Sequence, residues 1–89
     1  MRAVITVVGK DKIGIIAGVS TLLAEHQINI LDISQTILQD FFTMVMVVDL
    51  AKTDVSFEVL KSTLARKGEE MGLSIKIQHE DIFNAMHQI

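Results

Sequence analysis

The sequence predicts an α+β domain in which four strands and two helices follow one another in the order βαββαβ. Three observations lead to this prediction. Apolar residues alternate with polar ones over four segments, as they do in half-buried strands. Two other segments repeat their apolar residues at the three- and four-residue spacing of a helix that covers a core. The pair Gln39-Asp40 separates the second and third strand segments by a hairpin turn signal.

The four predicted strands each present one apolar face. They span residues 2–9, 27–39, 41–50 and 73–78. In the second strand we expect Leu31, Ile33 and Ile37 to share one face, because side chains alternate between the two faces of a strand. The apolar face of the third strand is expected to hold Phe42, Met44, Met46, Val48 and Leu50.

The two predicted helices span residues 13–26 and 54–71. Asp11 is expected to cap the first helix, because its carboxylate would lie near the positive end of the helix dipole. Gly72 suits a left-handed stop at the end of the second helix. A short third helix is expected in the tail, residues 81–89, where apolar residues recur at helical spacing.

The order βαββαβ favours a four-stranded antiparallel sheet with both helices on one face, the split βαβ or ferredoxin-like arrangement. In that topology the first and third strands are central, and the second and fourth strands are edges. Edge strands are where polar residues belong. The second and fourth strands indeed carry Asn29, Asp32, Gln35, Lys76 and Gln78.

The sheet face turned away from the helices is predicted to be apolar for a surface. Its expected residues are Val4, Thr6, Val8, Thr36, Thr43, Val45 and Val47. A second subunit packed on this face is one interpretation. The other interpretation is that the valines only serve the formation of strands.

Length and composition narrow the classes of function. The chain has 89 residues, which fits one domain over residues 1–89. Its basic residues are scattered and its net charge is −3, which argues against a nucleic-acid partner. The absence of cysteine excludes disulfides and thiolate zinc sites. No apolar run approaches the ~18 residues of a membrane span. We expect a cytoplasmic protein without a metal site, a cofactor or a membrane contact.

The turn "VVGKDKIGIIAG", residues 7–18, resembles a phosphate-binding loop in the spacing of its glycines. Gly9 and Gly14 have the glycine spacing of a Walker loop, but Ile15-Ile16 stand where lysine and serine are needed. The Gly-x-Gly start of a dinucleotide site is also missing. What remains is a helix N-terminus, whose free N–H groups attract an anion such as a carboxylate. The alternative is that Gly14 only relieves a tight turn.

The stretch "VVGKDKIGIIAGVSTLLAEHQINILDISQTI" resembles the first half of an ACT domain, a small regulatory module that binds amino acids. That family shows an Asp-x-x-Gly turn into a helix, and then Asn-Ile and an acidic residue at the start of the second strand. The matching positions are Asp11, Gly14, Asn29, Ile30 and Asp32. "ITVVGKDKIGI", "DISQT" and the final "IFNAMHQI" extend the resemblance to stand-alone ACT-domain proteins of the UPF0237 family, related to the glycine cleavage system transcriptional repressor.

The resemblance implies a homodimer whose subunits pair side by side, often through the second strand and the first helix, with an effector pocket between them. Backbone N–H groups of Gly14 and Ile15 would bind the α-carboxylate of an amino acid. From the other subunit, Asn29 and Asp32 would hold its α-amino group, and Asp11 would shape the loop. The candidate ligand-binding residues are therefore Asp11, Gly14, Ile15, Asn29, Ile30 and Asp32.

One rival function stays open beside the regulatory one. Most ACT domains are attached to an enzyme or a DNA-binding domain, and this chain carries neither, so its output would pass through a separate protein. The rival is a structural adaptor that binds a protein partner through its sheet or C-terminal tail. We expect no catalysis, because acylphosphatase-like chemistry needs an arginine in the loop at residues 9–13. An RNA-binding sheet would need aromatic residues on the open faces of its first and third strands, but the first strand has none and the third has only Phe41, at its start.

Overall fold

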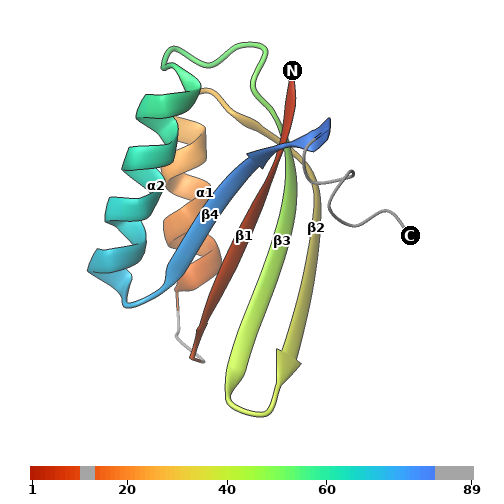
Figure 1. Cartoon of the computed structure of the whole chain (residues 1–89), viewed down its shortest axis with the longest axis vertical. Coiled ribbons are helices and arrows are strands. Elements are labelled where there is room, and N and C mark those ends of the chain that lie inside the picture. Colours follow the sequence, from red (N-terminus) through yellow and green to blue (C-terminus); the bar gives the residue numbers. More distant parts are fainter. Residues whose placement is uncertain (11–13, 82–89) are drawn as a thin grey trace.

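The computed structural model describes residues 1–10 and 14–81, and these residues follow the predicted order βαββαβ (Figure 1). The strands are β1 (Arg2–Lys10), β2 (Asn29–Leu38), β3 (Phe41–Asp49) and β4 (Ser74–His79). The helices are α1 (Ile15–Glu25) and α2 (Phe57–Met71). Each predicted boundary lies within three residues of the observed one. The tail helix predicted over residues 81–89 falls almost entirely outside the described residues.

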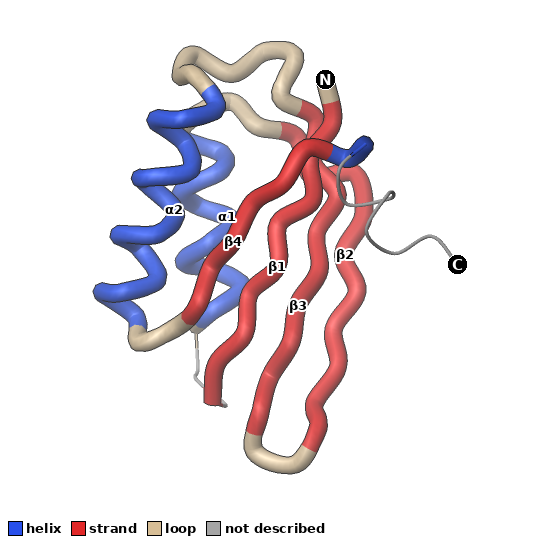
Figure 2. The backbone as a smooth tube through the Cα atoms, viewed as in Figure 1, coloured by secondary structure: helices blue, strands red, loops and turns tan. Residues whose placement is uncertain are grey.

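The described strands form one antiparallel sheet in the order β2-β3-β1-β4. The central strands are β1 and β3, and the edges are β2 and β4, which confirms the prediction made from the order of the elements. Both helices lie against the same face of this sheet, so the chain forms two layers (Figures 1 and 2). We call the other side of the sheet the open face.

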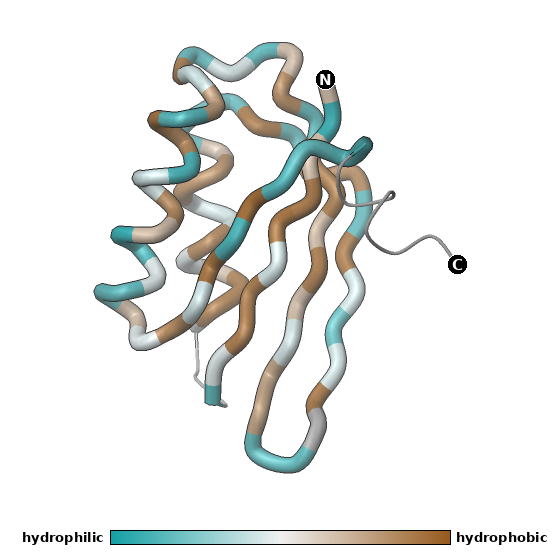
Figure 3. Tube along the Cα trace, viewed as in Figure 1, coloured by the Kyte–Doolittle hydropathy of each residue, from teal (hydrophilic) through white to brown (hydrophobic). Residues whose placement is uncertain are grey.

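The hydrophobic core fills the space between the sheet and the two helices, and the hydrophobic colours of the central strands in Figure 3 follow it. The apolar face predicted for β3 and the residue after it is confirmed, because all five of its side chains are buried. Full burial of an aliphatic side chain contributes about 1.5–3 kcal/mol. The helices bury Ile15, Val19, Leu23, Leu60 and Leu64 against the sheet.

The start of α1 differs from the prediction. The residue before the helix is Gly14, which has a left-handed backbone (φ 87°) and caps the helix without a side chain. A capping side chain must immediately precede the first helical residue. The prediction that Asp11 caps this helix is therefore wrong, because three positions separate it from Gly14; Asp11 itself lies outside the described residues.

The two ends of α2 follow local capping rules. Ser56 precedes the helix, and its Oγ accepts a hydrogen bond from the Val59 N–H at 3.2 Å. At the other end Gly72 is left-handed (φ 71°), as predicted. The N–H of Leu73 then donates to the Gly68 carbonyl at 2.7 Å, which closes the last turn.

One irregularity in β2 was not visible in the sequence pattern. The register of β2 against β3 shifts between Ile30 and Asp32, so Leu31 has no partner in β3 and forms a β-bulge. Ile33 and Ile37 share the helix-facing side of the sheet, as predicted, whereas Leu31 does not belong to their alternation. The bulge therefore decides which side chains of β2 face which side.

The open face carries the predicted valines and threonines. Cross-strand pairs on it are Val4–Val47, Thr6–Val45 and Val8–Thr43. Paired residues of neighbouring strands lie on the same face, so the predicted grouping is confirmed. Val4 is only 4% exposed and Val8 is 36% exposed, so this face is unevenly buried. A second subunit on the open face stays a prediction.

Candidate functional site

The first candidate region is the start of α1. The N–H of Gly18 donates to the Gly14 carbonyl at 2.9 Å and closes the first helical turn. The preceding N–H groups, from Ile15 to Ala17, have no partner within the helix, because the first turn of a helix has no helical carbonyl before it. Ile15 is only 3% exposed, and its side chain belongs to the hydrophobic core. A methyl group placed on Gly14 would meet no atom within 4 Å, so the space beside the turn is open.

The second candidate region surrounds Asn29, the first residue of β2. Asn29 is exposed and helps to line a hollow of about 210 Å³. The other lining residues are Gln27, Asp49, Ala51 and Lys52. Sequence reasoning missed Asp49 and Lys52, because only the pairing of β2 with β3 brings the end of β3 beside Asn29. The sequence signal that could have indicated them is the presence of charged residues at and just after the end of the neighbouring strand.

The other two candidates in β2 have different surroundings. Asp32 is exposed, and its Oδ1 accepts a hydrogen bond from the N–H of Ile33 at 2.9 Å. Asp32 pairs with Val47, which places it on the open face. The side chain of Ile30 packs against the core instead. Asp32 can thus present a carboxylate to a ligand, whereas Ile30 supports the strand.

Gly14 and Asn29 lie at opposite ends of the sheet. β2 runs from Asn29 to Leu38, and the end at Leu38 is the one at which β1 finishes before the turn into α1 (Figure 1). Nine residue steps separate the ends of β2, and at about 3.3 Å per step this is about 30 Å. One chain therefore does not bring the candidate residues together.

An exposed apolar surface accompanies β2 and α1. Ile16 in the first turn of α1 is 39% exposed, and Ile33 and Ile37 on the helix-facing side of β2 are 37% and 64% exposed. We call these three residues the β2–α1 surface. The sequence pattern predicted a shared face for the two β2 residues, but it did not show that the helices leave this part of the sheet uncovered. Exposed apolar groups of this kind mark interaction surfaces.

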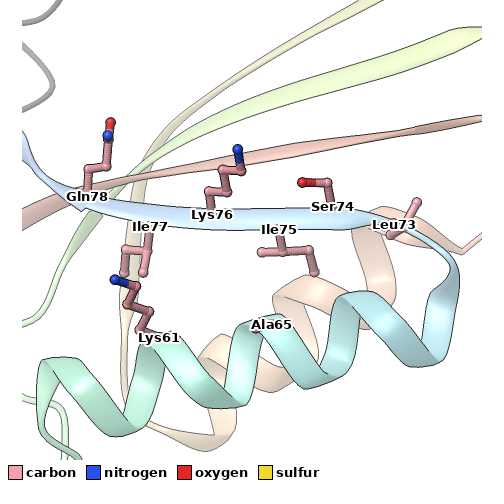
Figure 4. Close-up of a pocket in the computed structure, with 8 residues that line it drawn as sticks. All are labelled: Lys61, Ala65, Leu73, Ser74, Ile75, Lys76, Ile77 and Gln78. Atoms are coloured by element: carbon pink, nitrogen blue, oxygen red, sulfur yellow. The ribbon is translucent and has the colours of Figure 1, made fainter.

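A larger groove, of about 520 Å³, lies at the opposite edge of the sheet between β4 and α2 (Figure 4). None of the five described candidate residues (Gly14, Ile15, Asn29, Ile30 and Asp32) lines it. The larger groove and the candidate residues therefore lie in different parts of the molecule. The candidate site rests on Gly14, Asn29 and Asp32, and the groove is considered separately below.

The histidines of the described residues contact structural partners. His26 Nδ1 lies 3.4 Å from Asp54 Oδ1, and the ring of His79 packs on Phe57 with 4.0 Å between the ring centroids. Among residues 1–10 and 14–81, histidine, aspartate and glutamate side chains form no group of three that could hold a metal ion. No helix of the described part is long and apolar enough to cross a membrane.

Comparisons with known proteins agree with this architecture. The sequence model of the ACT domain family matches residues 2–78. A UPF0237 protein of Clostridium acetobutylicum is 61% identical over 89 residues, which is the whole of both chains. The solved structure of an ACT domain protein from Streptococcus pneumoniae superimposes with a TM-score of 0.84, at 47% identity over 98% of both chains.

A third similar protein is longer than this chain. The crystal structure of a putative glycine cleavage system transcriptional repressor superimposes with a TM-score of 0.74 at 26% identity. The match covers 86% of this chain but only 44% of the repressor chain. The similarity therefore extends over one part of that protein.

Proposed function

The chain belongs to the ACT domain family, and we propose that it is a non-catalytic regulatory module that binds an amino acid at the interface of a homodimer. The observation that supports the shared site is the separation of Gly14 from Asn29 along the sheet. Each subunit then supplies one half of a site, and neither half is complete alone.

Antiparallel pairing of two β2 strands would bring the two halves together. In a two-fold pairing centred on Ser34, Asn29 reaches the level of the partner's Leu38, because the bulge at Leu31 shortens this half of β2 by one step. This level is beside the start of the partner's α1. Asp32 is the single charged residue of β2, and in this register it lies opposite the partner's Thr36. Like charges therefore do not meet across the interface.

The β2–α1 surface supplies the apolar contact that such a dimer needs. Ile33 and Ile37 are exposed on β2, the edge that the second copy would cover, and Ile16 is exposed at the start of α1. Burying them contributes on the order of 1 to 2 kcal/mol per side chain. Pairing through β2 also satisfies the backbone groups of this edge, which are otherwise open to unspecific association.

The two halves complement the charges of an amino acid. The N–H groups at the start of α1 donate to an α-carboxylate, which the positive end of the helix dipole also attracts. Asn29 of the other subunit accepts from the α-amino group, whereas the carboxylate of Asp32 lies on the open face of the sheet, away from α1. A ligand that bridges both subunits stabilises the dimer by mass action.

Calorimetric titration with the common amino acids tests this proposal. We expect at least one of them to bind to the wild-type dimer, and Asn29→Ala to weaken that binding at least about tenfold, because a charge-assisted hydrogen bond is lost. Ser62→Ala, an exposed change on α2 outside both halves of the site, serves as the control and should bind as the wild type does. A folded dimer that binds none of the amino acids would overturn the effector part of the proposal.

Mixing two defective variants tests whether the site is shared. Gly14→Asn fills the open space beside the helix N-terminus, and Asn29→Ala removes the amide from the other half. A mixed dimer then has one site with both defects and one intact site, so mixing restores a site of wild-type affinity, which neither variant has alone. If both halves came from the same chain, no intact site would form and mixing would restore nothing.

A further inference from the structure

The groove between β4 and α2 has an apolar floor and a polar rim. Ile75 and Ile77 point from β4 toward α2, whereas Ser74, Lys76 and Gln78 point to the open face (Figure 4). From α2, Ala65 continues the floor, and Lys61 extends toward the strand (Figure 4). The free edge of β4 thus runs between two rows of side chains, one apolar and one polar.

The edge of β4 is open for backbone pairing. β4 is the last strand of the described sheet and pairs only with β1 on its inner side. In an antiparallel strand every second residue directs its N–H and C=O groups to one side. Over Ser74–Ile77, the described part of the chain provides no further strand that could accept the outward groups. Such an edge is a template for the addition of another strand.

The charge of the groove limits what can occupy it. Its described lining residues include Lys61 and Lys76 and no carboxylate, although the whole chain has a net charge of −3. Neither lysine forms an ion pair with any described residue. A second copy of β4 would bring its own two lysines to this edge, and like charges at that distance destabilise strand pairing. Acidic side chains at the same edge would be attracted.

We propose that the edge of β4 binds an extended segment of a partner protein by strand addition. The segment has aliphatic residues at alternate positions and acidic residues between them. Its aliphatic side chains lie over Ile75, Ile77 and Ala65, and its acidic side chains lie beside Lys76, with one end near Lys61. This surface is at the opposite edge of the sheet from β2, so the segment and a β2-paired dimer do not compete.

A synthetic peptide of alternating valine and glutamate is the probe for this site. Its binding to the full-length protein is measured by fluorescence anisotropy and by amide hydrogen exchange. In the free protein, alternate amides of Ser74–Ile77 should exchange rapidly, and the peptide should slow them. If these amides are already protected without the peptide, a second copy or the chain's own tail occupies the edge, and the proposal is overturned.

Two control peptides separate backbone pairing from charge attraction. An alternating valine and lysine peptide should not bind, because the lysines of the groove repel it. The valine and glutamate peptide with N-methyl groups along one edge should also fail to bind, because it cannot donate to β4. Equal binding of the N-methylated peptide would show charge attraction alone and would contradict strand addition.

Charge-reversal variants locate the binding surface. Lys61→Glu combined with Lys76→Glu should weaken peptide binding about tenfold or more, because two attractive pairs become repulsive. The matched control is Arg66→Glu, an exposed change in α2 outside the groove, which should weaken binding less than about threefold. Equal losses in the two proteins would place the peptide elsewhere and overturn the proposal.

Discussion

Gly14 holds a backbone conformation that other residues resist. Its φ of 87° lies in the left-handed region, where a Cβ atom costs about 1–2 kcal/mol for most residues. The space around it is open, so the strain comes from the backbone and not from a clash. The same residue directly precedes the first N–H groups of α1, which have no partner within the helix.

Substitution of Gly14 tests how much its left-handed backbone conformation contributes to stability. Gly14→Ala should lower the free energy of unfolding by about 1 kcal/mol, and Gly14→Asn should lower it less, because asparagine tolerates the left-handed region. Urea denaturation at fixed protein concentration measures both. An alanine variant as stable as the wild type would show that the left-handed conformation is not required in solution.

Gly68 is required for a different reason, which is close packing. A methyl group on it would lie 2.8 Å from the Leu73 carbonyl oxygen and 3.3 Å from Ile75 Cγ1. The oxygen belongs to the backbone and cannot rotate away. This glycine therefore sets how closely the last turn of α2 approaches β4.

Gly68→Ala should destabilise the protein by about 1–3 kcal/mol through overpacking, although alanine favours the helix. The control is Ser62→Ala, an exposed change in the same helix, which should stay within about 0.5 kcal/mol of the wild type. Thermal unfolding followed by circular dichroism distinguishes the two. If alanine at position 68 stabilised the protein, helix propensity would outweigh the contact with Leu73.

At the scale of elements, the two helices begin in contrasting ways. α2 has Ser56 as a capping side chain, whereas α1 has Gly14 and no capping side chain at that position. A capped helix has fewer free N–H groups to offer to a ligand. The uncapped start belongs to the helix that we place at the effector site.

Removing the cap of α2 should therefore affect stability and leave effector binding unchanged. Ser56→Ala should cost about 1 kcal/mol, and Ser56→Asp should retain most of the stability, because its carboxylate also accepts from the N–H of Val59. Urea denaturation and calorimetry measure the two properties. Loss of effector binding in Ser56→Ala would mean that α2 takes part in the site.

The edge strands also differ as elements. β2 exposes isoleucines toward the helix side and has a single charge, whereas β4 has Lys76 and a neighbouring lysine on α2. An apolar edge suits a second copy of the same chain, and a basic edge suits an acidic partner. The two edges are therefore assigned different partners.

At the scale of the whole molecule, the proposed dimer links assembly to stability. Ile37→Lys should convert the dimer to a monomer, because it places a charge in the apolar contact, and sedimentation velocity measures the change. The matched control is Val59→Lys, which replaces a side chain that is 51% exposed on α2, away from the edge. The control protein should remain dimeric.

Thermal unfolding gives a second measurement of the same dimer. The wild-type melting temperature should rise with protein concentration, and that of Ile37→Lys should not, because only dimer formation links stability to concentration. If the Ile37→Lys protein remains dimeric, another surface, such as the open face, forms the interface.

Local patterns in the sequence determined the elements of this protein. Alternating residues predicted the strands, helical spacing predicted the helices, and Gly72 and Gln39-Asp40 predicted two of the turns. Gly14, Asn29 and Asp32 were also recognisable, because the resemblance rests on residue types at fixed spacings. Each of these signals involves residues that are close together in the sequence, so it can be recognised without the tertiary structure.

Contacts between residues far apart in the sequence decided the features that local patterns did not predict. The bulge at Leu31, the exposure of Ile37 and the hollow shared by Asn29 and Lys52 depend on how β2 pairs with β3 and how far the helices reach over the sheet. The same pairing separates Gly14 from Asn29, which no local pattern shows. Tertiary structure thus decided that one chain keeps Gly14 and Asn29 apart, because register and coverage arise only when segments far apart in sequence pack together.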